Sequence, residues 1–215
     1  FIPDLTVFNG GLLEAGSQGV QVGVVVPSLA LFGAHHRSLL DNGMVRKNDF
    51  DTCSWATADA AKDNQTGTKR SLIEAGVCKD FVALRSGAGV GHNQAEQTWV
   101  NGGNAKFSGE HLIVEAAQQF ANGIEGSLLG YYGSFNTELN RKYLNGINID
   151  SSTAKPKAAS VALRARVEMK DVVKQGNVSV SPYAAYTYTK TKLEAYMENG
   201  GGFPAQYDAA TFKSN

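Results

Sequence analysis

The segment Ser160–Lys170 reads SVALRARVEMK, and apolar and polar side chains alternate along it without interruption. A period of two places successive side chains on opposite faces of a β-strand, whereas a helix requires a period near 3.6. The apolar face consists of Val161, Leu163, Ala165, Val167 and Met169, and the other face of Ala162, Arg164, Arg166, Glu168 and Lys170. This segment therefore predicts a long strand with one apolar and one charged face.

A second alternating strand follows a short turn predicted at residues 174–177. Its apolar face carries Val178, Val180, Pro182, Ala184, Tyr186 and Tyr188, and its other face is rich in serine and threonine. Both strands are predicted to be roughly 11 to 15 residues long, whereas strands in soluble sheets average about 5 to 6. Long strands with one apolar and one polar face are typical of a barrel wall between lipid and water.

The composition excludes some functions. The chain has 215 residues, with 20 Lys and Arg against 20 Asp and Glu. A formal net charge of zero argues against nucleic-acid binding, which requires a basic excess. No apolar run of about 18 residues is present, so no transmembrane helix is expected, while a membrane barrel stays possible because alternation dilutes hydropathy. No signal peptide opens the chain at Phe1, so we expect a processed form or a fragment.

Before the strands, the sequence predicts one helix. Residues 1–27 carry short alternations and glycines, which indicate either the last rung of a stacked β-solenoid or an extended linker. Pro27 and Ser28 supply helix start signals, and Gly43 is a natural C′ residue. A single apolar stripe runs along the segment between them, formed by Leu29, Phe32, His36, Leu39 and Leu40. A barrel lumen or the end of a soluble sheet could bury this stripe.

From Cys53 onward the sequence predicts only strands, which are seven in number with the start of an eighth. They are Cys53–Ala61, Thr68–Lys79, Phe81–His92, Phe107–Phe120, Ile124–Phe135, the two strands described above and Gln206–Phe212. Short links at 79–80, 121–123 and 175–177 alternate with long polar links at 62–67, 93–106, 136–156 and 198–205. Outer-membrane barrels show this asymmetry, with short periplasmic turns and long outer loops.

Four segments resemble a known family. They are Pro182–Tyr186 (PYAAY), Gly200–Ala205 (GGGFPA), Ile124–Gly133 (IEGSLLGYYG) and His35–Asp41 (HHRSLLD). Their order and spacing resemble the translocator barrel of bacterial autotransporters (type V secretion), from about Ser28 to the C-terminus. The resemblance implies an all-β, antiparallel up-and-down transmembrane barrel of twelve strands in the bacterial outer membrane. It also implies a lumen helix linked to an exported passenger in cis, and folding by the outer-membrane barrel assembly machinery.

Carried onto this chain, the resemblance makes residues 28–43 the lumen helix and residues 53–215 the barrel wall. Seven to eight strands do not close a twelve-stranded barrel, and lipid cannot satisfy an open sheet edge. The chain also ends at Phe212–Asn215 without the terminal aromatic residue expected for assembly. We therefore expect a C-terminally incomplete wall.

The polar strand faces provide the candidate site residues. Those expected to line the lumen are Arg70, Glu74, Arg85, His111, Glu115, Arg164, Arg166, Glu168 and Lys170. A water-filled lumen accepts such charges, whereas a dry core would cost several kcal/mol for each unpaired one. We expect them to hydrate the pore and to hold the helix through Arg37 and Asp41. The alternative is the solvated outer face of a soluble sheet.

Aromatic and cysteine residues give two further predictions. Trp99, Tyr143, Tyr186 and Tyr188 are expected in the interfacial aromatic belts of a membrane protein. Cys53 and Cys78 fall in the first two predicted strands, where a cross-strand disulfide is geometrically possible in an exported protein. Two buried free thiols are the alternative.

No catalytic, cofactor or metal site is expected. The glycines of Gly87–Gly91 lack the strand-to-helix setting of a phosphate loop and more often make room for something packed on the wall. His35 and His36 diverge by about 100° on a helix, so they cannot easily share a metal ion. Neither a GxSxG motif nor a histidine partner for Cys53 is apparent. Asp41–Gly43 is either a helix C-cap or a self-cleavage point of the kind that some autotransporters use.

The predicted function is an outer-membrane translocator that anchors and exports an N-terminal passenger and is not itself an enzyme. Its partners would be the lipid bilayer, the passenger and the assembly machinery, with no nucleic acid and no cofactor. The alternatives are an autotransporter hydrolase (protease or esterase) defined by its passenger, a general diffusion porin and a soluble β-sandwich binding module.

Overall fold

The computed structural model describes residues 46–47, 52–62, 64, 68–82, 84–98, 102–120, 123–176 and 178–215, most of which lie in strands. The strands are β1 (Arg46–Lys47), β2 (Thr52–Lys62), β3 (Lys69–Phe81), β4 (Leu84–Thr98), β5 (Asn104–Gln119), β6 (Ile124–Asn145), β7 (Asn148–Ala154), β8 (Lys157–Met169), β9 (Val173–Gln175), β10 (Val178–Val180), β11 (Tyr183–Leu193), β12 (Tyr196–Met197), β13 (Gln206–Tyr207) and β14 (Ala210–Ser214). The expected helix at residues 28–43, with Arg37 and Asp41, lies outside the described residues, as does Trp99.

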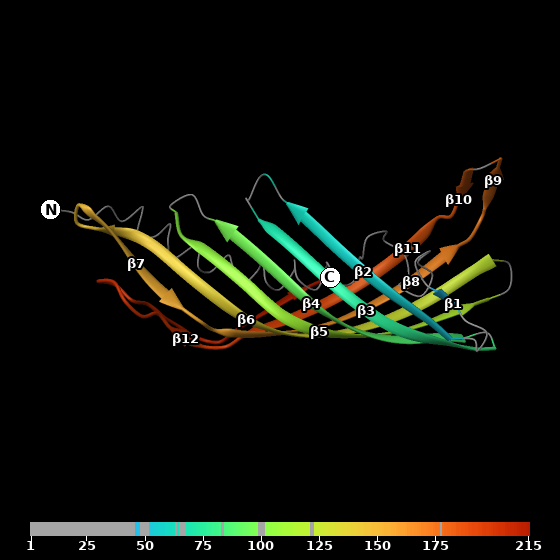
Figure 1. Ribbon diagram of the computed structural model, residues 1–215, viewed down its shortest axis with the longest axis horizontal. Helices are drawn as coiled ribbons and strands as arrows, with labels where there is room; N and C mark the ends of the chain where they lie inside the picture. The colour runs from blue at the N-terminus through green and yellow to red at the C-terminus, as the bar shows by residue number, and fades with distance from the viewer. Residues whose placement is uncertain are drawn as a thin grey trace.

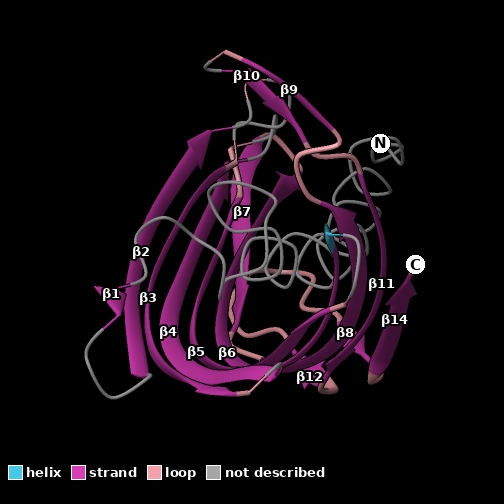
Figure 2. Ribbon diagram, turned by 90° about the vertical axis from the view of Figure 1, so that its right-hand side faces the viewer, coloured by secondary structure: helices cyan, strands magenta, loops and turns pink. Residues whose placement is uncertain are grey.

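The main sheet is an antiparallel meander in which the paired strands follow one another in chain order, although β7, β9–β10 and β12–β13 intervene in the sequence. Its order is β1-β2-β3-β4-β5-β6-β8-β11-β14, with β7 paired to β6 as an extension (Figure 1). The expectation of an all-β antiparallel sheet is confirmed. The sheet curls into an arc (Figure 2), and within the described residues no pairing joins β14 to β1 or β2. The described part of the wall is therefore open.

The two faces of the wall differ sharply. Apolar side chains on the convex outer face keep between 45% and 67% of their surface exposed. They are Ile73, Val77, Val90, Leu112, Val114, Leu128, Tyr132, Val161, Leu163, Val167 and Met169. The concave inner face is buried and mixes charged and hydroxyl side chains with Leu72, Ile113 and Leu129. The register also shows which residues of the fifth predicted strand lie on each face. Leu129 and Tyr131 are buried on the inner face, while Leu128 and Tyr132 are exposed on the outer face.

Two of the predicted long links are largely strand. The predicted loop 136–156 is a β-hairpin, in which β6 continues to Asn145 and β7 pairs with it down to Leu139↔Ala154 (Figure 1). Much of the predicted loop 93–106 is also strand, because β4 continues to Thr98 and β5 begins at Asn104. The loop prediction was wrong because both faces become polar here. Polar alternation still forms strands where a hairpin projects into water.

The predicted turn at 174–177 is the tip of a separate hairpin, β9–β10, and the wall strand resumes only at Tyr183. The register shifts because four residues lie between Glu168 and Val173, whereas only two lie between Val180 and Tyr183. Asp171 absorbs the difference with a φ of 54°, and its carboxylate accepts a hydrogen bond from the Ser179 hydroxyl. This local kink bends β9–β10 away from the wall (Figure 1).

The predicted eighth strand is also displaced. β14 covers Ala210–Ser214 and pairs with β11, so the strand begins after the predicted start at Gln206. The two residues Gln206 and Tyr207 form β13, which pairs with β12 in a separate two-stranded sheet.

Candidate functional site

A chain of buried hydrogen bonds crosses four adjacent strands on the inner face. Trp55 Nε1 on β2 donates to Glu74 Oε1 on β3 at 3.0 Å. His111 Nε2 on β5 lies 2.9 Å from Glu74 Oε2, and Asn93 Nδ2 on β4 lies 2.7 Å from His111 Nδ1. With the Asn93 amide donating to Nδ1, the imidazole carries its proton on Nε2 and donates it to Glu74. The network therefore satisfies a carboxylate that would be costly to bury alone.

Glycines make room for this network. A Cβ added at Gly76 would lie 2.1 Å from Cζ2 of Trp55, and one added at Gly91 would lie 2.3 Å from Cε1 of His111. The glycines on the inner face thus accommodate large side chains from neighbouring strands. This is a different occupant from the predicted lumen helix, which lies outside the described residues.

A second charged group lies toward the end of the wall that carries the short links. The guanidinium of Arg166 donates to Glu168 at 2.8 Å and lies 4.3 Å above the Tyr183 ring. The ammonium of Lys170 lies 2.7 Å from the carboxylate of Glu125. Most of the charges here have an opposite charge within reach, as buried charges require.

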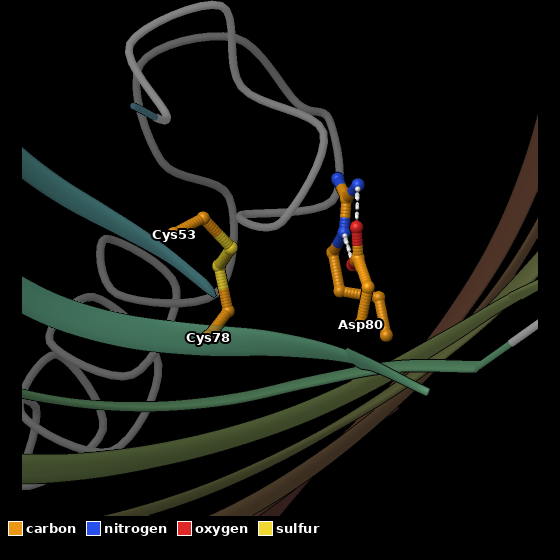
Figure 3. Close-up of a disulfide and its surroundings, with 4 residues drawn as sticks. Cys53, Cys78 and Asp80 are labelled. Atoms are coloured by element: carbon orange, nitrogen blue, oxygen red, sulfur yellow. Dashed lines mark hydrogen bonds and ion pairs between the residues drawn. A yellow bond between two sulfur atoms is a disulfide. The ribbon is translucent and has the colours of Figure 1, made fainter. Parts of the chain in front are cut away.

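Cys53 and Cys78 lie directly opposite each other in β2 and β3, and a disulfide joins them (Figure 3). Their Cα atoms are 4.8 Å apart and both side chains are buried on the inner face. Toward the adjoining turn, Asp80 accepts two hydrogen bonds from the Arg85 guanidinium, one of them from Nη2 at 3.0 Å.

The structure places eight of the nine predicted lumen residues on the inner face, because the register gives them the same strand parity as the buried positions, and Lys170 lies in the turn that follows β8. It joins Glu74 to His111 and Arg166 to Glu168. The residues in question are Arg70, Glu74, Arg85, His111, Glu115, Arg164, Arg166, Glu168 and Lys170. Arg70, near the start of β3, joins neither of these two pairs. Sequence analysis missed Trp55, although it lies in the predicted strand Cys53–Ala61, and it missed Asn93, which the prediction placed in the long link 93–106.

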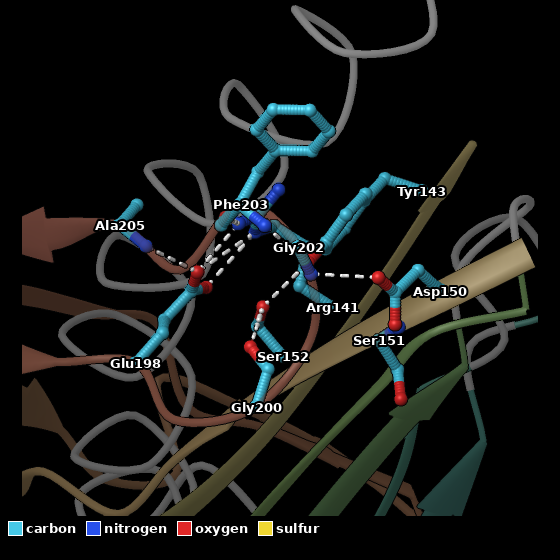
Figure 4. Close-up of polar contacts among 10 residues, drawn as sticks. All are labelled: Arg141, Tyr143, Asp150, Ser151, Ser152, Glu198, Gly200, Gly202, Phe203 and Ala205. Carbon is cyan, nitrogen blue, oxygen red and sulfur yellow. Dashed lines mark hydrogen bonds and ion pairs between the residues drawn. The ribbon is translucent and has the colours of Figure 1, made fainter. Parts of the chain in front are cut away.

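A third polar cluster, also missed, lies at the end of the wall that carries the long links (Figure 4). Arg141 Nε on β6 donates to Glu198 Oε1 at 2.9 Å, and Nη2 donates to the Phe203 carbonyl at 2.8 Å. Glu198 Oε2 also accepts a hydrogen bond from the Ala205 amide at 3.0 Å. Arg141 is 1% exposed and Glu198 3%. The hydrogen bonds to Glu198 raise the pKa of Arg141, and burial opposes them.

The same cluster holds residues 198–205, which we call the rim strap. Tyr143 Oη lies 2.9 Å from Ser152 Oγ and accepts a hydrogen bond from the Phe203 amide at 3.1 Å. Ser152 Oγ donates to the Gly200 carbonyl at 2.9 Å, and the Gly202 amide donates to Asp150 at 2.7 Å. The strap is therefore fastened to the β6–β7 hairpin (Figure 4).

This arrangement corrects one prediction. Tyr143 is buried on the inner side of β6 and does not lie in a lipid-facing belt. Arg141 and Tyr143 continue the parity of the inward-facing residues Phe135 and Leu139, and that continuity was the signal that the loop assignment concealed. Tyr186 and Tyr188, in contrast, are exposed on the outer face.

The described residues contain no group of three or more histidine, cysteine or acidic side chains arranged to hold a metal ion. Among the same residues, no helix is long and apolar enough to cross a bilayer.

A long-stranded antiparallel wall, exposed and apolar outside but buried and polar inside, defines an outer-membrane barrel protein. Residues 53–215 match the family model described as autotransporter beta-domain, which covers more than half of the chain. The chain therefore belongs to the autotransporter beta-domain family and is an outer-membrane translocator domain of type V secretion. A comparison with curated proteins found no match.

Proposed function

We propose that this domain anchors an N-terminal passenger in the outer membrane and exports it to the cell surface through a closed barrel. In this proposal residues 1–27 are the passenger end or a linker, residues 28–43 form the lumen helix, and residues 53–215 form the wall. The observation that carries the proposal is the division of the sheet into an exposed apolar face and a buried face that mixes charged and hydroxyl side chains with apolar ones.

The inner face suits a conduit for polypeptide. Its hydroxyl and paired charged side chains offer hydrogen bonds to a passing backbone, and its charges are compensated locally, as at Glu74–His111 and Arg166–Glu168. A wall of this kind needs a hydrated interior and a closed edge, because lipid leaves backbone groups unsatisfied. The barrel assembly machinery of the outer membrane is the expected partner in closing it.

The links at the two ends of the wall support an orientation. β3 joins β4, and β5 joins β6, through short turns, whereas the β6–β7 hairpin and the rim strap extend the opposite end. By analogy with other outer-membrane barrels, the extended end faces outward.

A soluble β-sandwich would require a second protein layer over the outer valines and leucines, and these side chains are exposed. A diffusion porin and a passenger with hydrolase activity are separated from the proposal by experiment. Any enzymatic activity would belong to the passenger.

Export is tested by fusing a reporter protein upstream of Phe1 and measuring its digestion by added protease in intact cells. The matched control carries the same reporter without residues 53–215. We expect digestion only with the full fusion. A reporter that stays protected while the domain is folded in the outer membrane would contradict the export proposal.

The lumen helix is tested by deleting residues 28–43 and recording conductance in planar bilayers. We expect a larger conductance because the plug is gone, and single replacements of Arg37 and Asp41 by alanine should raise conductance to a smaller extent. Conductance equal to that of the intact domain would argue against a plugged pore.

A further inference from the structure

Three lysines gather on the outer face where β11 meets β14. Lys190 and Lys192 lie on β11, and Lys213 on β14 is the register partner of Lys190. All three follow the parity of the outward-facing Tyr188, because Tyr188 pairs with Leu163 and Lys190 with Val161. We call this group the lysine triad.

The lysine triad lacks compensating charge. Like charges directly opposite in an antiparallel pair lie about 4.5 to 5.5 Å apart at Cβ and destabilise it. The described residues provide no ion pair to any of the three lysines, and Glu194, the residue that follows β11, forms none with them.

Other lysines on the same face do have acidic partners. Lys106 lies 3.5 Å from Glu96, and Lys155 lies 2.7 Å from Glu138. The outer face is thus balanced at these two positions and unbalanced at the triad. An anion from outside the chain would offset the repulsion between Lys190 and Lys213.

The neighbouring residues place the triad at the level of lipid headgroups. Tyr186 and Tyr188 are exposed on the outer face immediately before Lys190, and tyrosines concentrate at membrane–water interfaces. Val161, the register partner of Lys190, is the last large apolar residue of β8 on this face, and only Ala159 lies between it and Lys157. Lysine stems extend along apolar surface while their ammonium groups stay in the polar layer.

We propose that the lysine triad binds the phosphate group of a glycolipid in the outer leaflet. A phosphate monoester carries a charge of about −1.5 to −2 at neutral pH, which is enough to offset the Lys190–Lys213 repulsion. Lysine binds phosphate as a point charge with three donors. The adjoining tyrosines and valine offer acyl-chain contacts that free phosphate could not use. The assignment to the outer leaflet rests on the orientation given under the proposed function.

Lipid retention tests the proposal. The full chain, purified in neutral detergent, is mixed with phosphatidylcholine bicelles that contain diphosphorylated lipid A, and bound lipid A is measured by mass spectrometry after size exclusion. Each basic residue near an anionic surface contributes about a fivefold gain in affinity at low salt. We expect the K190Q/K192Q/K213Q variant to lose at least tenfold in lipid A retention, and the matched K106Q/K155Q control to change less than about twofold.

The outcomes separate the sources of phosphate. Equal retention by the triad variant and wild type would overturn the proposal. Displacement of lipid A by inorganic phosphate at an equal molar concentration would assign the site to a free anion and would also overturn it. Lipid A without its phosphate groups should bind wild type no better than it binds the triad variant.

A single replacement gives a readout that does not depend on the triple variant folding. Lys213→Gln removes the repulsion, so it should raise the unfolding temperature in neutral detergent. Lipid A should then stabilise wild type more than Lys213→Gln. The proposal would be contradicted if Lys213→Gln had the same unfolding temperature as wild type without lipid and if lipid A raised both unfolding temperatures equally. These measurements use detergent and bicelles, so they are independent of whether a passenger is exported.

Discussion

Replacement of Arg141 by alanine should release the rim strap from the wall. Arg141 holds the strap through its bonds to the Glu198 carboxylate and the Phe203 carbonyl, and both members of the ion pair are almost fully buried. The substitution leaves the Glu198 carboxylate buried without its countercharge. Breaking one side of a buried pair costs about 3 to 5 kcal/mol.

Amide hydrogen exchange is the appropriate assay because the effect is local opening. The amides of Phe203 and Ala205 donate to Tyr143 and Glu198, so each reports directly on the latch. A loss of about 3 kcal/mol or more corresponds to exchange faster by roughly 100-fold or more. Amides in the middle of β5, such as that of Ile113, should keep their protection.

Two variants sharpen the result. Lys155→Ala removes an exposed ion pair with Glu138 at the same rim and should cost no more than about 1 kcal/mol. In Arg141→Met/Glu198→Met both charges are removed, and the double variant should open less than Arg141→Ala alone. If Arg141→Ala leaves exchange of the Phe203 and Ala205 amides unchanged, the ion pair does not hold the strap.

Three further predictions concern the inner face, the disulfide and pH. Gly76→Val should lower the free energy of unfolding by about 1 to 3 kcal/mol, because its Cβ meets the Trp55 ring, although valine favours strands. Cys53→Ser should cost about 3 kcal/mol for a disulfide that closes a 25-residue separation, and reductant should then have no further effect on denaturation. Hydrogen bonds from the Asn145 side chain and from backbone amides lower the pKa of Asp150. The hydrogen bond from the strap to the Asp150 carboxylate therefore contributes fully to stability above the ordinary carboxyl pKa, and this contribution is lost as the pH falls through the lowered pKa. The chemical shift of the Gly202 amide should therefore change as the pH falls below about 4 in wild type, and it should stay constant in Asp150→Asn.

Each prediction has a control. Gly130→Val places its Cβ 3.3 Å from a Val114 methyl on the outer face, so it should be tolerated better than Gly76→Val. Equal losses at the two glycines would contradict the role given to Trp55. Wild type that is insensitive to reductant, or a strap amide that titrates in Asp150→Asn as in wild type, would count against the other two predictions.

Alternation along the sequence was sufficient to predict the wall. The β8 segment and its neighbours predicted strand type, face and antiparallel order, because a period of two fixes which side chains share a face. The register of Cys53 with Cys78, the pairing of Glu74 with His111 and the neighbours of Trp55 could not be read from the chain. They depend on how far each strand slides past the next, and alternation is unchanged by a slide of two residues.

The rim was predicted less well for a different reason. The prediction treated polar composition between residues 136 and 156 as loop, although Asn145 and Gly146 provide a hairpin turn signal and Arg141 and Tyr143 keep the strand parity. The Arg141–Glu198 pair joins residues far apart in sequence through a single long-range contact, and composition carries no trace of such a contact.

The position of the disulfide has a mechanical consequence. Thr52 pairs with Lys79 on the first rung of the β2–β3 ladder, and the covalent Cys53–Cys78 link is the second rung. Tension arriving along the chain from its N-terminal side would reach this crosslink before it could peel β2 away one hydrogen bond at a time. The load would pass instead into β3 as shear along the ladder, the direction in which many rungs resist together.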